Sequence, residues 1–67
     1  MRPQRIGKVL KKLREAKGFS QLELAKQAKV AQAYISEMEA GQKKNPGIDT
    51  LRKLAKALGV PVTELLG

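Results

Sequence analysis

The sequence predicts an all-α fold, a compact bundle of about five short helices, and three observations support this. Apolar residues recur at helical spacing in successive segments, and no segment alternates apolar and polar residues as a strand would. Glycine follows three of these segments, at Gly18, Gly41 and Gly59, as is typical of helix C-termini. A chain of 67 residues is long enough for one small domain, so we expect residues 1–67 to form a single domain.

The first helix is expected over about residues 4–17. Ile6, Val9, Leu10 and Leu13 follow the i, i+3, i+4, i+7 spacing that places them on one helix face. Basic residues lie off this face, and we expect most of them to form a solvated surface.

The start of the second helix is marked by two local motifs. Ser20 and Glu23 have the S-x-x-E spacing of a capping box, in which each side chain bonds the other residue's backbone N–H. Phe19 and Leu24 stand at the positions of a hydrophobic staple around the same cap. A short helix over about residues 21–28 is therefore expected.

Three further helices complete the predicted bundle. The apolar pattern breaks after the second helix and resumes with Ile35 and Met38, which predicts a third helix ending near Ala40. A basic, turn-rich loop follows over residues 42–47. A fourth helix is predicted by the stripe Ile48, Leu51, Leu54, Ala55 and Leu58, and a last short helix after Pro61 by Val62, Leu65 and Leu66.

Composition restricts the possible functions. Fourteen basic residues against six acidic ones give a net charge of +8, which is as compatible with a nucleic-acid or anionic-membrane partner as with a solubilising surface. The chain has no cysteine and no histidine, which argues against disulfides, structural zinc and histidine-based catalysis. Its acidic residues are scattered singly and no glycine-rich phosphate loop occurs, so we expect no enzyme, no cofactor and no small-molecule ligand.

Location is predicted from the hydropathy pattern. No apolar run approaches the roughly 20 residues that span a bilayer, and charges interrupt the N-terminal segment too often for a signal peptide. We therefore expect no membrane association and a cytoplasmic protein.

Two short helices joined by three or four residues, inside a small basic all-α domain, indicate a helix-turn-helix over about residues 20–40. Particular residues strengthen this interpretation: Ser20-Gln21, Leu24-Ala25, Val30, Ile35-Ser36, Glu39, Gly41, Pro46, Leu54-Ala55 and Leu58-Gly59-Val60. With these residues, about residues 5–66 resemble the helix-turn-helix DNA-binding domain of phage repressors and Cro, found in XRE-like bacterial transcription regulators. The resemblance implies that the third helix lies in the major groove while the second crosses the DNA backbone.

Three residues of the third helix are the candidates for base contacts that the resemblance implies. Gln32 could pair with adenine, Ala33 could contact the thymine methyl group, and Glu37 could accept a hydrogen bond from cytosine. A helix without lysine or arginine could thus still read sequence. The alternative for these three residues is an ordinary exposed helix surface.

Phosphate contacts would supply most of the affinity. By position in the family, the candidates are Gln21, Tyr34, Ser36, Gln42, Lys43, Lys44 and Asn45. Tyr34 has a competing interpretation, which is packing against the protein's own surface. The chain has one tyrosine and one phenylalanine, too few aromatic residues for a base-stacking platform, which argues against RNA or single-strand recognition.

The resemblance also implies two structural roles. Glu39 is expected to form an ion pair with Arg14 that ties the first helix to the third. Dimer contacts are expected from the loop before the last helix and from that helix, at Val60, Pro61, Val62 and Leu66, whose alternative is packing within the monomer.

The sequence departs from the family pattern at four positions. Lys29 stands where glycine is usual in the turn, so a positive φ there would strain the backbone. Ala31 replaces the usual Ser or Thr N-cap of the third helix. Glu37 and Ala40 occupy positions that are often basic or polar, which bears directly on base recognition.

The function favoured by these features is sequence-specific binding of double-stranded DNA by a bacterial or phage-encoded transcription regulator. We expect a repressor that acts as a homodimer on a palindromic operator. Alternatives with the same DNA-binding domain are an antitoxin and a restriction–modification controller protein. A further alternative is a protein-interaction adaptor that has lost DNA binding, which the acidic third helix favours.

Overall fold

The computed structural model describes residues 3–42 and 47–66, and within these ranges it consists of helices and connecting turns. The five helices are α1 (Pro3–Ala16), α2 (Gln21–Ala28), α3 (Gln32–Glu39), α4 (Ile48–Leu58) and α5 (Val62–Leu66). Their bounds agree with the apolar periodicity to within one or two residues, and the predicted all-α class is confirmed. In this described part of the chain, no helix combines the length and the apolar character needed to cross a bilayer.

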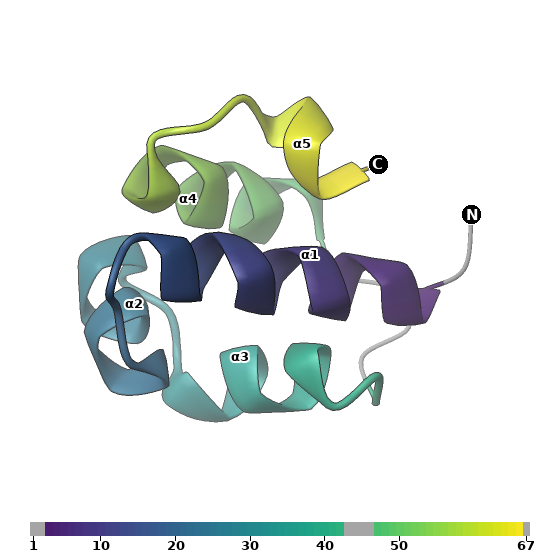
Figure 1. Cartoon of the computed structure of the whole chain (residues 1–67), viewed down its shortest axis with the longest axis horizontal. Coiled ribbons are helices and arrows are strands. Elements are labelled where there is room, and N and C mark those ends of the chain that lie inside the picture. Colours follow the sequence, from purple (N-terminus) through teal and green to yellow (C-terminus); the bar gives the residue numbers. More distant parts are fainter. Residues whose placement is uncertain (1–2, 43–46, 67) are drawn as a thin grey trace.

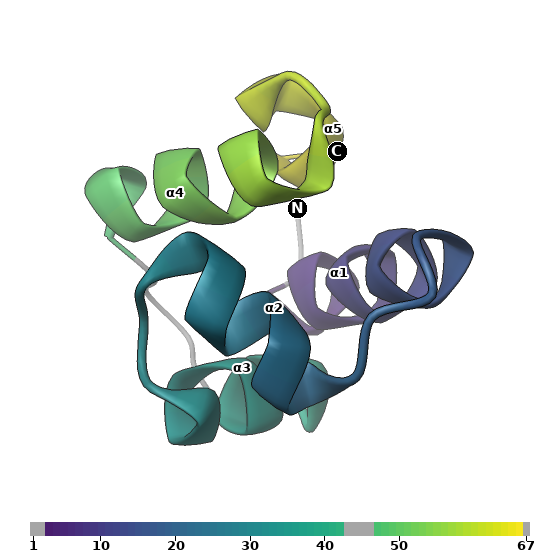
Figure 2. The ribbon, with the colours of Figure 1, turned by 90° about the vertical axis from the view of Figure 1, so that its left-hand side faces the viewer.

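The helices are arranged around α1. In Figure 1, α3 lies along one side of α1, while α4 and α5 lie on the opposite side. Helix α2 covers one end of this arrangement and contacts both α3 and α4. Figure 2, turned by 90°, shows α2 crossing over α3 with its C-terminal end beside α4. This arrangement places α3 at an outer edge of the molecule, with one face inward and one outward.

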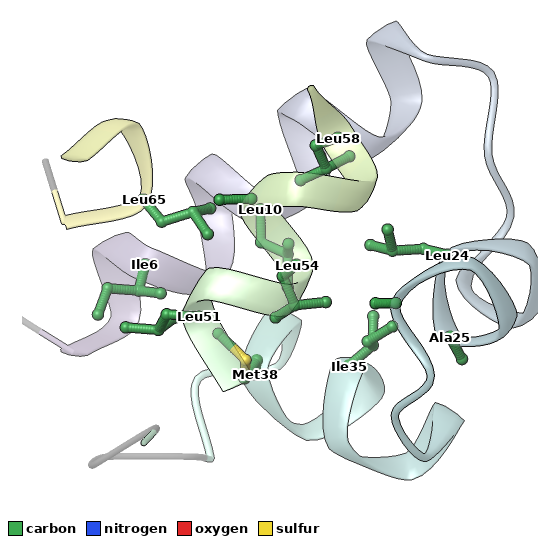
Figure 3. Packing of buried hydrophobic residues seen from close by; sticks show 12 residues of the cluster. Ile6, Leu10, Leu24, Ala25, Ile35, Met38, Leu51, Leu54, Leu58 and Leu65 are labelled. Carbon is green, nitrogen blue, oxygen red and sulfur yellow. The ribbon is translucent and has the colours of Figure 1, made fainter. Parts of the chain in front are cut away.

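A single hydrophobic core joins the five helices (Figure 3). Every helix contributes at least one fully buried apolar side chain, which lets a small chain exclude water from its centre. The residues without measurable exposure are Leu10, Leu24, Ile35, Leu54, Leu58 and Leu65. Because the outer helices α2 and α3 bury only part of their surface, their remaining residues are available to other molecules.

Helices α1 to α4 end in the same way, with a left-handed residue that bonds back to the preceding turn. At α1, α3 and α4 this residue is glycine, with φ of 75° at Gly18, 78° at Gly41 and 72° at Gly59. At α2 it is Lys29, with φ of 59°. The expected helix-ending glycines are thus confirmed, and the turn between α2 and α3 contains a side chain in a conformation that glycine adopts more easily.

The two helices of the predicted helix-turn-helix, α2 and α3, begin differently. The Ser20 Oγ accepts a hydrogen bond from the Glu23 backbone N–H at 3.0 Å, and Glu23 Oε1 accepts one from the Ser20 N–H at 2.8 Å. The predicted capping box is therefore confirmed. These hydrogen bonds with Ser20 hold the pKa of Glu23 below its ordinary value. At α3, Ala31 is the N-cap and provides no side-chain hydrogen bond, so this helix lacks that source of stability.

Gly7 makes the closest approach between α1 and α3, and the sequence did not indicate it. A Cβ atom at Gly7 would overlap the Met38 carbonyl oxygen, and it would lie 2.9 Å from the Met38 carbonyl carbon and 3.2 Å from the Glu39 Cα. All three are backbone atoms, so no side-chain rotation could relieve the overlap. The distance between α1 and α3 therefore depends on glycine at this position.

Candidate nucleic-acid interface

Helix α3 has one buried face and one exposed face. Ile35 and Met38 are buried in the core. Gln32, Ala33, Ser36 and Glu37 are exposed, and their i, i+1, i+4, i+5 spacing places them together on the outer face. The structure thus brings the three candidate base-contact residues, with Ser36, onto one outward surface. We call these four residues the outer face of α3.

The two glutamates of α3 lie in different environments. Glu39 is turned toward α1, and its side chain is 5% exposed, whereas Glu37 is exposed on the outer face. Because Glu39 is paired with a cation, α3 presents one acidic side chain outward rather than two. The electrostatic obstacle to binding a polyanion is correspondingly smaller than the sequence suggests.

Arg14 and Glu39 form the predicted ion pair with two-point geometry. Arg14 Nε donates to Glu39 Oε2 at 2.7 Å, and Arg14 Nη2 donates to Glu39 Oε1 at 2.9 Å. Arg14 Nη1 also donates to the Phe19 carbonyl oxygen at 2.8 Å. The Arg14 side chain is 10% exposed, so water competes little with these bonds. One guanidinium group therefore connects α1, the segment before α2 and the end of α3.

The pair alters the pKa values of both partners. Hydrogen bonding to Glu39 raises the pKa of Arg14 above its ordinary value, although burial acts in the opposite direction. Burial tends to raise the pKa of Glu39, but the hydrogen bonds from Arg14 and Gln21 and the Arg14 charge together hold it below the ordinary value. Both groups are therefore charged at neutral pH.

Gln21 belongs to the same network. Its Nε2 donates to Glu39 Oε1 at 3.0 Å, so this oxygen accepts from both Gln21 and Arg14. The Gln21 amide group has a second N–H hydrogen and a carbonyl oxygen that can make other contacts. The phosphate contact of Gln21 therefore stays a prediction. The structure adds that the bond to Glu39 orients the Gln21 side chain at the start of α2, which the sequence did not indicate.

Tyr34 lies in a different setting from the other phosphate candidates. Its side chain is half-buried and packs against the core, and the hydroxyl oxygen is buried. This favours the alternative interpretation, packing against the protein's own surface. The side chain would have to rotate outward before the hydroxyl group could contact a phosphate.

The loop candidates are only partly within the described residues. Gln42 is exposed, and its backbone N–H is bonded to the Glu37 carbonyl oxygen at 2.9 Å, which fixes how the chain leaves α3. Lys43, Lys44 and Asn45 lie outside the described residues. Their phosphate contacts therefore stay predictions from the sequence.

Three of the candidate dimer residues lie at the start of α5, and Leu66 lies at its end. Pro61 is exposed, whereas Val60, Val62 and Leu66 are half-buried and pack against the core. Part of each of these three side chains thus serves the monomer, in agreement with the alternative considered for them. Their remaining surface and Pro61 form a small, partly apolar area.

The α2–α3 corner, with its left-handed turn residue and the outward polar face on its second helix, defines a helix-turn-helix protein. Comparison with known proteins agrees with this class. The chain belongs to the helix-turn-helix family HTH_3, whose family model matches residues 10–65.

Two related proteins illustrate the similarity. The HTH-type transcriptional regulator SinR of Bacillus subtilis is 43% identical over 61 residues, which cover 91% of this chain and 55% of that protein. The structure of SinR, a master regulator for biofilm formation, in complex with DNA has a TM-score of 0.90 at 42% identity, covering 92% of this chain and 98% of that one. The restriction-modification controller protein C.AhdI from Aeromonas hydrophila has a TM-score of 0.87 at 37% identity, covering 92% of each chain. The chain spans about half the length of the curated relatives it matches.

Proposed function

We propose that this chain is the DNA-binding part of a transcription regulator and binds double-stranded DNA with α3 in the major groove. The observation that carries the proposal is the outer face of α3, which holds polar and small side chains outward while the Arg14–Glu39 pair holds the helix against α1. The related regulator SinR has been solved with DNA bound at 42% identity to this chain, which supports the same role here.

Base recognition is proposed for Gln32, Ala33 and Glu37. Glutamine can pair with adenine through two hydrogen bonds, alanine can contact the thymine methyl group, and glutamate can accept from the cytosine amino group. Each such residue needs an exposed position, and all three are exposed. Gln32 and Ala33 lie at the N-terminal end of α3, and Glu37 lies about one turn further along. Where the groove presents no hydrogen-bond donor to Glu37, its carboxylate would be repelled by the DNA phosphates.

Most of the affinity is proposed to come from residues outside α3, with Ser36 as a phosphate candidate on α3 itself. The net charge of +8 is carried by other parts of the chain, because α3 contains no lysine or arginine. Phosphate contacts from Gln21, Ser36, Gln42 and the segment 43–45 would position the helix, and neutralising phosphates releases counterions. Binding should therefore weaken steeply as salt is added.

We further propose that the protein is cytoplasmic, forms a two-fold dimer when it binds DNA, and represses transcription from a palindromic site. The partly apolar area of Val60, Pro61, Val62 and Leu66 would form the contact between copies. Because this area is small, the free protein need not be dimeric. A dimer of this kind places its recognition helices one turn of DNA, roughly 34 Å, apart.

A second candidate function is control of a restriction–modification system. It is favoured by the 37% identity and TM-score of 0.87 to the controller protein C.AhdI over 92% of each chain. Both functions use the same surface, so they differ in the gene that lies beside the binding site rather than in the structure of the domain.

Selection of bound duplexes from a random pool at low salt tests the proposal. We expect enrichment of one half-site sequence, an altered preference for Gln32→Ala, and unaltered preference with weaker binding for Lys43→Ala as the matched control. If no duplex is enriched, the protein is instead an adaptor without DNA binding, the alternative that the acidic Glu37 favours.

A further inference from the structure

A pocket of about 430 Å³ lies where the C-terminal end of α2 meets α4. Figure 2 shows these two elements side by side, with α3 on the other side of α2. Among the described residues, the pocket is lined by Gln27, Ala28, Lys29, Lys53, Lys56 and Ala57. None of these residues belongs to the outer face of α3, so the pocket is separate from the surface proposed to read bases.

The lining is strongly basic. Lys29, Lys53 and Lys56 are exposed side chains around the hollow, and the lining residues that the structure describes include no carboxylate. The small side chains Ala28 and Ala57 are buried and half-buried, which leaves space between the helices. Three lysine side chains line one hollow, so an anion bound there could interact with more than one positive charge.

Ordinary helix electrostatics explain only part of this arrangement. Lys56 is in the last turn of α4 and Lys29 is the C-cap of α2, two positions where the helix dipole favours a cation. Lys53 lies in the middle of α4, where the dipole gives no such preference. The dipoles therefore account for Lys29 and Lys56 but not for Lys53.

The backbone of Lys29 is a second, independent observation. Helices α1 to α4 are each followed within two residues by a left-handed residue, which is glycine after α1, α3 and α4. After α2, Lys29 adopts φ of 59° and contributes its side chain to the lining of the pocket. Strained non-glycine residues of this kind concentrate at functional sites, where the side chain is needed in spite of the strain.

We propose that this pocket binds a phosphate group through Lys29, Lys53 and Lys56, separately from any base recognition by α3. Lysine is a point-charge donor suited to phosphate, and each ammonium group offers three hydrogens. Pyrophosphate carries more than one negative charge at neutral pH, and successive backbone phosphates of a nucleic acid carry one each, so either source can balance more than one ammonium group. The pocket is open to solvent, and its volume of about 430 Å³ leaves room for a phosphate group.

The test is an NMR titration with inorganic pyrophosphate at constant ionic strength. We expect amide shifts concentrated on residues 27–29 and 53–57, and at least fivefold weaker binding for Lys29→Gly and for Lys53→Ala. Lys12→Ala is the matched control, an exposed lysine on α1 that does not line the pocket, and should bind within twofold of the wild type. Since Lys29→Gly relieves backbone strain, weaker binding by this variant cannot be attributed to unfolding.

A second titration identifies the source of the phosphate. A short duplex of unrelated sequence replaces pyrophosphate, and shifts at residues 27–29 and 53–57 with the duplex alone would assign the site to a nucleic-acid backbone. Shifts with pyrophosphate would assign it to a free phosphate compound. Shifts spread equally over α1, unaltered affinity of Lys29→Gly, or no response to either probe would overturn the proposal. None of these results depends on whether α3 selects a DNA sequence.

Discussion

Replacing Gly7 with alanine separates two physical effects of opposite sign. Helix propensity alone favours alanine over glycine inside a helix by about 1 kcal/mol. In α1, however, the new Cβ would overlap the Met38 carbonyl oxygen and approach the carbonyl carbon to 2.9 Å, well inside the roughly 3.5 Å of an ordinary carbon contact. Because the neighbours are backbone atoms, α1 and α3 would have to move apart.

The size of the effect follows from these contacts. Overpacking costs about 1–3 kcal/mol, and displacement of a whole helix belongs at the upper end of that range. We therefore expect Gly7→Ala to lower the free energy of unfolding by about 2–3 kcal/mol. A domain of this size has roughly 3–10 kcal/mol in total. With about 4–8 °C per kcal/mol, the Tm should fall by about 8–24 °C.

Thermal and urea unfolding followed by circular dichroism would measure this change. Gly47→Ala is the matched control, because Gly47 has φ of −66° and, among the described residues other than its chain neighbours, no atom lies within 4 Å of the place that its Cβ would take. This control should alter stability by less than about 1 kcal/mol. A Gly7→Ala variant as stable as the wild type, or more stable, would refute the close approach of α1 and α3.

Three further predictions concern the turn and the ion pair. Lys29→Gly should stabilise the domain by about 1 kcal/mol in urea unfolding, because glycine adopts φ of 59° without strain, and a loss of stability would contradict this. Glu39→Leu alone should cost about 3–5 kcal/mol because it leaves Arg14 buried and unpaired, whereas Arg14→Leu/Glu39→Leu should cost much less; additive losses in this double-mutant cycle would exclude a coupled pair. Since the pKa of Glu39 is lowered in the folded protein, the pair's contribution is complete above the ordinary glutamate pKa of about 4.3 and is lost as the pH falls through the lower folded value. The Tm of the wild type should thus fall more below about pH 4 than that of the double-leucine variant, and parallel curves would contradict the shift.

Features set by neighbouring residues could be predicted from the sequence. The capping box at Ser20 and Glu23 and the left-handed glycines that end helices depend on contacts within one turn. Local hydrogen bonding determines both of these, so a short stretch of sequence contains the necessary information. The positive φ at Lys29 was suggested instead by the glycine that is usual at this position in the family.

Features that depend on packing between helices could not be predicted in this way. Gly7 in a helical pattern gave no sign of which backbone it approaches, because that depends on how α3 lies against α1. The bond from Gln21 to Glu39 joins residues 18 positions apart. Tyr34 could be placed neither inward nor outward from periodicity, because it lies at the border of the buried face of α3. The pocket between α2 and α4 likewise exists only once the two helices meet.

The ion pair shows what the family resemblance and the structure each contribute. Arg14 and Glu39 were expected to pair because they match positions of a known family, not because their spacing along the chain requires it. The structure adds the Phe19 carbonyl oxygen and Gln21 as further partners of the pair. The pair thereby links the orientation of α3 to the start of α2, which is where phosphate contacts are proposed.

The most direct test of DNA reading by α3 compares wild type and Gln32→Ala on a selected half-site and its complete set of single-base variants. Binding should be measured by fluorescence anisotropy at one fixed salt concentration, because phosphate contacts make affinity depend on salt. A base-specific contact predicts that the wild type loses about 1–3 kcal/mol for changes at one base pair and that Gln32→Ala loses this discrimination at that position alone. Equal weakening by Gln32→Ala on every variant, or an unaltered preference at every position, would contradict base recognition by the outer face of α3.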